Sequence, residues 1–287
     1  MLRKLIRDIE GLDAVDHLSG RVGGWVQRVT RRDAVQNALV GTWLGHKLHP
    51  VLTDLPIGAW TMAAALDVTA GPSGATAARR LVGLGVLATL PVAATGATDW
   101  SVSYGAGQRV GAVHALTNVT ATAVQTASWL ARRRGRRATG MALSGAALGL
   151  TIFAGDLGGH LTLVQGVGVN HTAFEPEVTD WTDVAALADL SDGKLVRVTP
   201  GGVPVVLARH RGSIHALSAD CVHASGPLDQ GTVVADGCIR CPWHGSVFRL
   251  TDGRVTRGPA SVDQPSWQVR VDNGRVLVRS AAPAAGS

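Results

Sequence analysis

Cysteine and histidine occur close together twice in the last third of the 287-residue sequence. The first pair is Cys221 and His223 in CVHASG, and the second is Cys241 and His244 in CPWHGS. Two thiolates and two imidazoles suit a [2Fe-2S] cluster whose two irons have different ligands, and they also suit a structural zinc ion. The glycine and proline turns around both pairs, and a spacing unlike that of a zinc finger, favour the cluster.

The sequence around these residues predicts a small all-β domain. From Lys194 onward, short β-rich stretches alternate with Asp-Gly, Asn-Gly and Gly-Gly turns, as in hairpins. The two Cys/His loops interrupt this predicted sheet. The third cysteine, Cys238, lies three residues before Cys241, and we expect it to pack as a small apolar residue. Three closely spaced cysteines do not suggest a secreted disulfide scaffold.

The two loops resemble those of Rieske proteins. The resemblance covers residues 176–280 and includes CVHASGPLDQG, CPWHGSVF and the later turn RGPAS, which is similar to the proline-bearing loop that covers the cluster in that family. It implies that Cys221 and Cys241 bind one iron and that His223 and His244 bind the other. Neutral imidazoles in place of two thiolates raise the reduction potential to roughly −150 to +300 mV.

The same resemblance implies roles for the residues around the cluster. High-potential members carry a cysteine where Gly226 and Trp243 stand here, so we expect no disulfide between the loops. Ser246 matches a serine that hydrogen-bonds the cluster region, whereas Phe248 replaces a tyrosine that does so. Because only one of these two hydroxyl donors is present here, we predict an intermediate reduction potential for the cluster. Trp243 is expected to shield the cluster from water, and Pro259 lies in the covering loop.

The first half of the chain predicts an all-α transmembrane four-helix bundle. Three uncharged runs, 81–98, 110–131 and 138–155, reach the length needed to cross a bilayer, about 17 to 25 residues. A fourth run, 51–70, is weaker because it contains Asp54 and Asp67. The abundant small residues suit closely packed helices. A buried, soluble four-helix bundle is the alternative.

A second resemblance supports this architecture. The stretches HPVLTDLPIGAW and GGHLTLVQGVGVNH are similar to parts of an uncharacterised bacterial four-helix membrane domain, sometimes fused to iron–sulfur modules, over residues 40–171. We therefore predict a multidomain chain. Its parts are an amphipathic helical region at 1–45, the transmembrane domain at 46–171 and an all-β Rieske-type domain at 176–280.

Polar residues cluster at one end of the predicted bundle. Histidines expected at this end are His49, His114 and His160, with His171 just after the last helix. In the third helix, His114, Asn118, Thr122 and Gln125 form one polar stripe that should face the interior. A pocket of this kind would suit a haem with histidine axial ligands, a quinone headgroup or a metal. The alternative is that these histidines simply lie at the membrane interface.

The formal charge of +6 does not indicate nucleic-acid binding. The arginines gather at the ends of apolar runs, notably within 132–137, which suits lipid headgroups. Aromatic residues make up only 4% of the chain, and none are interleaved with a basic stretch as a base-stacking surface requires. We expect a multi-pass protein of the cell membrane. The basic loops favour an external Rieske domain, but the basic N-terminal segment and the missing disulfide favour the cytoplasmic side, where we place it.

The function that these features predict is membrane-anchored electron transfer. One electron would pass through the cluster between redox donor and acceptor proteins, or to or from a haem or quinone in the bundle. We expect a carrier or oxidoreductase component without catalytic residues of its own. A redox sensor is the alternative. An oxygenase would need a mononuclear iron site in a large following domain, which we do not expect beyond Val278.

Overall fold

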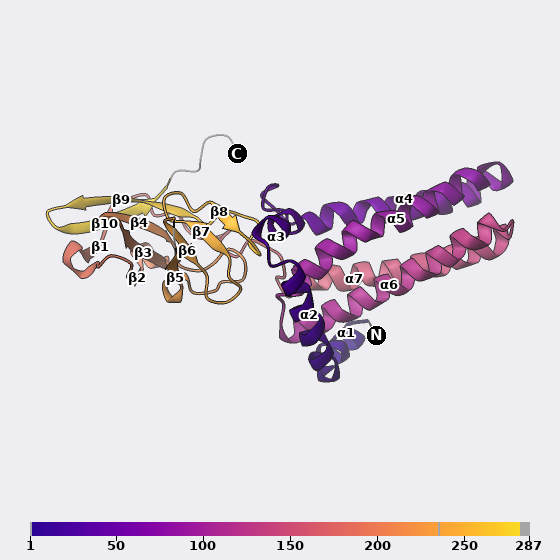
Figure 1. The fold of residues 1–287 in the computed structure, drawn as a ribbon, viewed down its shortest axis with the longest axis horizontal. Coiled ribbons are helices and arrows are strands. Elements are labelled where there is room, and N and C mark those ends of the chain that lie inside the picture. Colours follow the sequence, from indigo (N-terminus) through magenta and orange to yellow (C-terminus); the bar gives the residue numbers. More distant parts are fainter. Residues whose placement is uncertain (1, 235, 282–287) are drawn as a thin grey trace. The chain divides into compact units, whose positions relative to one another are not determined.

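The computed structural model describes residues 2–234 and 236–281, and it divides into two compact units. The helical unit contains the residues up to Arg32 and Lys47–Val167, and the β unit contains Asp33–His46 and the chain from Gly168 onward. The first 46 residues are therefore shared between the units. Figure 1 shows the helices of the first unit and the strands of the second.

The helical unit is built on two long helical hairpins. Its helices are α1 (Leu2–Glu10), α2 (Asp16–Val29), α4 (Leu48–Thr69), α5 (Ala75–Trp100), α6 (Gly105–Arg133) and α7 (Arg137–Leu163). A 3-10 turn at Gly71–Gly74 joins α4 to α5, and a short turn joins α6 to α7. The all-α expectation for this part of the chain is confirmed. The many small residues allow these helices to approach closely.

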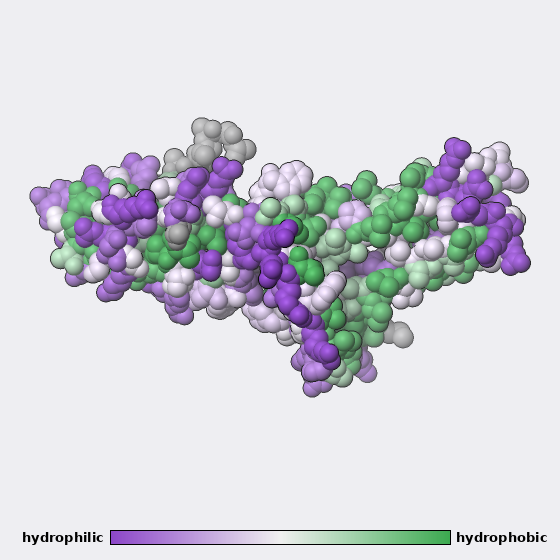
Figure 2. All heavy atoms as spheres, in the orientation of Figure 1, coloured by the Kyte–Doolittle hydropathy of each residue, from purple (hydrophilic) through white to green (hydrophobic). Residues whose placement is uncertain are grey.

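Among the helices that the structure describes, three are long and apolar enough to cross a membrane: Leu48–Thr69, Gly71–Trp100 and Arg137–Leu163. The expectation that run 51–70 is the weakest is wrong, because α4, which contains it, meets this criterion and α6 does not. The polar stripe of α6, which includes His114 and Gln125, lowers its hydropathy. Figure 2 shows hydrophobic residues along the visible faces of these helices and hydrophilic residues at the end with the interhelical turns.

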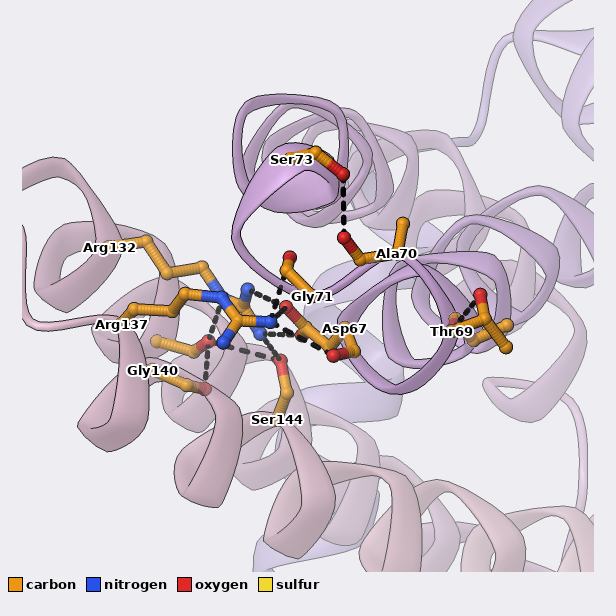
Figure 3. A network of polar contacts seen from close by, with 11 residues as sticks. Asp67, Thr69, Ala70, Gly71, Ser73, Arg132, Arg137, Gly140 and Ser144 are labelled. Carbon is orange, nitrogen blue, oxygen red and sulfur yellow. Dashed lines mark hydrogen bonds and ion pairs between the residues drawn. The ribbon is translucent and has the colours of Figure 1, made fainter.

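Asp67 in α4 is neutralised by arginines from the other hairpin (Figure 3). Arg132 of α6 donates two hydrogen bonds to its carboxylate, at 3.0 and 2.5 Å. Arg137 of α7 donates to the carbonyl of Asp67 at 2.9 Å and lies 3.5 Å from its carboxylate. Asp67 and Arg132 are both buried. An apolar helix tolerates this carboxylate because its charge is paired. The expectation that Arg132 faces lipid headgroups is wrong, since it pairs with Asp67 instead.

The β unit contains ten strands among its described residues. They are β1 (Thr182–Ala186), β2 (Leu195–Val198), β3 (Val205–His210), β4 (Ser213–Ser218), β5 (Thr232–Val234), β6 (Cys238–Arg240), β7 (Val247–Arg249), β8 (Val255–Arg257), β9 (Ser266–Asp272) and β10 (Arg275–Ser280). They form a six-stranded sheet, ordered β1-β10-β9-β4-β3-β2, and a four-stranded sheet, ordered β5-β6-β7-β8. All of the described strand pairs are antiparallel. The predicted all-β domain is confirmed.

Two hydrophobic cores stabilise the β unit. One centres on the six-stranded sheet and includes Trp267. The other joins Leu217 of β4 to Ile239 and Phe248 of the smaller sheet, and it includes the buried Cys221 and Cys241. The two cysteines are therefore fixed by a packed core that connects both sheets.

Candidate metal centre

The two Cys/His loops have the same backbone design. In each, the N–H of the cysteine donates to the carbonyl five residues later, at 2.9 Å for Cys221 and 2.8 Å for Cys241. In each, the cysteine carbonyl accepts from the N–H four residues later, at 2.8 and 3.2 Å. The residue at that fourth position has a positive φ, 56° at Ser225 and 75° at Gly245. One tight loop is thus used twice, although the histidines follow at different intervals.

The two sulfur atoms lie together in the core. A hydrogen bond from Cys221 lowers the pKa of Cys241 to about 6, and this same bond raises the pKa of Cys221. Backbone N–H groups two and three residues after each cysteine also lower its pKa, since they donate to the sulfur. These four amides favour negative charge on the sulfur atoms.

The two imidazoles form a second pair. The ring centroids of His223 and His244 are 5.0 Å apart, with their planes at 80°. Two imidazoles bound at roughly a right angle to one metal have centroids about 4.5 Å apart, given metal–nitrogen distances of about 2.0–2.1 Å. Burial lowers the pKa of His244, which favours the neutral form that binds metals.

This division of ligands fits a two-iron cluster better than a single ion. Within 2–234 and 236–281, no three His, Cys, Asp or Glu side chains are placed to hold one metal ion. A zinc ion would need all four ligands around one point, whereas a mixed cluster needs sulfur at one iron and nitrogen at the other. A Cβ at Gly226 would lie only 2.8 Å from the sulfur of Cys241, so glycine keeps this space open.

Two family comparisons cover most of the chain. The Rieske [2Fe-2S] domain matches residues 180–268, and the predicted membrane protein domain DUF2231 matches residues 45–171. The ferredoxin component of the alkene monooxygenase system of Xanthobacter autotrophicus is 34% identical over 104 residues, covering 36% of this chain and 84% of that protein. The chain belongs to the Rieske [2Fe-2S] family.

Further known proteins match part of the chain. Ferredoxin CarAc of Metapseudomonas resinovorans is 31% identical, over 34% of this chain and 92% of its own length. The solved ferredoxin of carbazole 1,9a-dioxygenase from Nocardioides aromaticivorans is 30% identical and covers 36% of this chain and all of its own, with a TM-score of 0.35. Human apoptosis-inducing factor 3 is 34% identical over 125 residues, and the chain spans only a fifth of it. The Rieske domain match and the ferredoxins of Xanthobacter autotrophicus and Metapseudomonas resinovorans indicate a [2Fe-2S] cofactor and a role in electron transfer.

Gln264 supports the first loop of the Rieske domain, and sequence analysis did not predict it. Its Oε1 accepts from the N–H of Val222 at 3.0 Å, and its Nε2 donates to the carbonyls of Ser218 and Asp220, both at 2.8 Å. The side chain is buried. The backbone before and after Cys221 is therefore held by one amide. No sequence signal distinguishes this glutamine from others.

Asn37 supports the proline-bearing loop of the Rieske domain from the N-terminal region. It lies in α3 (Asp33–Val40), which belongs to the β unit. Its Nδ2 donates to the carbonyl of Thr256 at 2.9 Å, and its Oδ1 accepts from the N–H of Gly258 at 3.0 Å. Pro259 follows directly. Sequence analysis placed residues 1–45 in a separate region and so missed this contact.

The predicted neighbours of the cluster lie around the two loops. The hydroxyl of the buried Ser246 accepts from the N–H of Ala260 at 3.0 Å, so it links the second loop to the proline-bearing loop. Phe248 is buried in the core. Trp243 has a ring centroid 6.3 Å from that of His244, and 51% of the residue is exposed. The three cysteines, all within the described residues, form no disulfide.

The histidines of the predicted bundle separate into different environments. His49 and His114 have ring centroids 6.5 Å apart. His160 instead has Nε2 at 2.8 Å from the carboxylate of Glu10. His171, expected beside the end of the bundle, belongs to the β unit, where its N–H donates to the carbonyl of Val222 at 3.0 Å.

Proposed function

We propose that this protein is a membrane-anchored Rieske electron carrier in which Cys221 and Cys241 bind one iron and His223 and His244 the other. The observation that carries the proposal is the separation of a sulfur pair from an imidazole pair, with ring centroids 5.0 Å apart. When bound, a [2Fe-2S] cluster of this kind takes up and releases one electron.

The protein around the site would tune the reduction potential of the cluster. Four backbone N–H groups would favour the more negative, reduced state, and we expect the hydroxyl of Ser246 to do the same. Phe248 offers no donor, which supports an intermediate potential. The sulfur ligands are buried, whereas His223 and His244 are only half-buried. Electrons would therefore enter and leave on the histidine side.

The helical unit would serve as the anchor. Three apolar helices and the match to a predicted membrane protein domain support a multi-pass position in the cell membrane, with lipid around residues 46–171. We propose that the Rieske domain, at 176–280, lies on the cytoplasmic side, supported by its lack of a disulfide between the described cysteines. The preceding residues 1–45 would lie on the same side.

The electron partners are proposed from relatives and from the helical unit. Relatives include ferredoxin components of alkene monooxygenase and naphthalene 1,2-dioxygenase systems, which supports an oxygenase-type protein as a redox partner. A haem or quinone near His49, His114 or His160 would be a second partner. No catalytic step is assigned to this chain.

Metal and sulfide analysis of detergent-purified, full-length protein tests the proposal. We expect about two non-haem irons and two acid-labile sulfides per chain. Cys241→Ser should abolish the cluster, whereas Cys238→Ser, three residues away and also buried, should retain it. Cluster retention in Cys241→Ser, or zinc in place of iron, would contradict the proposal.

A further inference from the structure

Two histidines of the helical unit are held by the same arrangement. His49 of α4 has Nδ1 at 3.1 Å from the carbonyl of Val92 in α5. His114 of α6 has Nδ1 at 2.8 Å from the carbonyl of Ala154 in α7. A carbonyl oxygen can only accept a hydrogen bond, so Nδ1 carries the proton in both rings. The lone pair of each neutral imidazole is therefore at Nε2.

A glycine makes each of these contacts possible. Gly96 and Gly158 lie four residues after the accepting carbonyls. A Cβ at Gly96 would be 2.7 Å from Cε1 of His49, and one at Gly158 would be 3.3 Å from Cε1 of His114. Because helical side chains lean toward the N-terminus, a larger residue there would cover the carbonyl four positions before it. Each hairpin thus exposes one carbonyl that orients one histidine.

The two oriented rings are neighbours. Their centroids are 6.5 Å apart and their planes are at 76°. Imidazoles on opposite sides of one metal have centroids about 6 Å apart, given metal–nitrogen distances of about 2.0–2.1 Å. Donation of the remote N–H to a backbone carbonyl is also the usual support of a metal-bound histidine. Asn118 independently supports this tautomer of His114, because its Nδ2 lies 3.2 Å from Nε2, as a donor to the lone pair would; binding of iron at Nε2 would replace this contact.

We infer that His49 and His114 are the two axial ligands of one haem iron. A bare transition-metal ion needs four or more ligands, and within the described residues no third His, Cys, Asp or Glu joins this pair. Haem brings four nitrogen ligands of its own and needs only two from the protein. A quinone carbonyl would need a donor, but the N–H of each ring is already engaged.

This inference rests on the proposed function only in placing the helices in a membrane. Of the haem and the quinone proposed there for the helical unit, it selects haem. His160 is not part of the site, because its Nε2 faces the carboxylate of Glu10 at 2.8 Å. It therefore serves as a matched control: it lies at the end of α7 in the same unit, is also half-buried, and belongs to no such pair.

Haem content and the visible spectrum of the full-length protein, produced with haem supplied and purified in detergent, test this site. We expect about one haem per chain with a six-coordinate, low-spin spectrum. His49→Ala and His114→Ala should each lower the haem content at least about tenfold, since even loss of a supporting partner costs that much affinity. His160→Ala should retain it. If His114→Ala misfolds, His114→Gly supplied with imidazole should regain the low-spin spectrum.

The cluster signal, measured on the same samples, separates this inference from the proposed function. Protein that contains the cluster but takes up no haem after addition of haemin overturns the inference and leaves the electron-transfer proposal standing. Haem at the same level in both alanine variants, or a metal bound to the pair without porphyrin, also overturns it. Haem lost from the two variants while the cluster signal is retained supports it.

Discussion

The side chain of Gln264 holds the backbone N–H of Val222 at 3.0 Å, across 42 residues of sequence. This bond joins the segment after the proline-bearing loop to the residue between the two ligands of the first loop. Two further bonds from the same amide fix the carbonyls of Ser218 and Asp220. The geometry of the sulfur and imidazole pairs therefore depends on a side chain outside both loops.

Gln264→Leu should weaken the cluster site. It leaves one buried N–H and two carbonyls without their partner, and each such loss costs about 1–3 kcal/mol. We expect a lower denaturant midpoint for bleaching of the cluster absorption and faster iron loss to a chelator. Gln268→Leu, on the exposed part of β9, is the matched control. Equal effects of the two substitutions would show that Gln264 has no special role.

Asn37→Ala should loosen the proline-bearing loop. The substitution removes the bonds to Thr256 and Gly258, and two hydrogen bonds of this kind are worth about 1–3 kcal/mol together. Chelator-induced iron loss should accelerate, with little change in the visible spectrum. Asp33, which lies in the same helix as Asn37, forms an exposed ion pair with Arg257 of β8. Asp33→Asn removes this pair, which is worth at most about 1 kcal/mol, and should change this rate little. An unchanged rate in Asn37→Ala would refute the role of α3.

Ser246→Ala should lower the reduction potential of the cluster. A hydrogen bond to a charged group is worth about 1.5–3 kcal/mol, which for one electron corresponds to roughly 60–130 mV. Protein-film voltammetry would measure the shift. Ser225→Ala, an exposed serine in the other loop, should leave the potential unchanged. A potential that rises or stays constant in Ser246→Ala would mean that the hydroxyl does not stabilise the reduced state.

Asp67→Asn should destabilise the helical unit. It leaves the buried guanidinium of Arg132 without its carboxylate, a change that costs about 3–5 kcal/mol in buried pairs. The thermal unfolding midpoint in detergent should fall clearly. Arg133→Met, at an exposed neighbouring position, should have little effect. The double variant Asp67→Leu with Arg132→Met should recover much of the loss, and its failure to do so would exclude unpaired charge as the cause.

The assignment of four side chains to the cluster is a prediction from the sequence, and it rests on the fact that few chemistries need two thiolates and two imidazoles in two short loops. The sequence did not predict Gln264 or Asn37, since both act through the backbone of distant segments, and no local pattern marks an amide side chain for such contacts. Asp67 looked like a defect in a membrane helix because its partner Arg132 lies 65 residues away. His49 and His114 were both predicted, but only the structure separates this pair from His160.

The most direct test of the central claim is pulsed electron-spin resonance of the reduced, full-length protein with its histidines labelled with nitrogen-15. The account predicts coupling of the cluster spin to two histidine nitrogens, which is lost when His223 or His244 is substituted and unaffected by His215→Ala. A cluster signal without histidine nitrogen coupling would contradict the assignment of imidazoles to one iron.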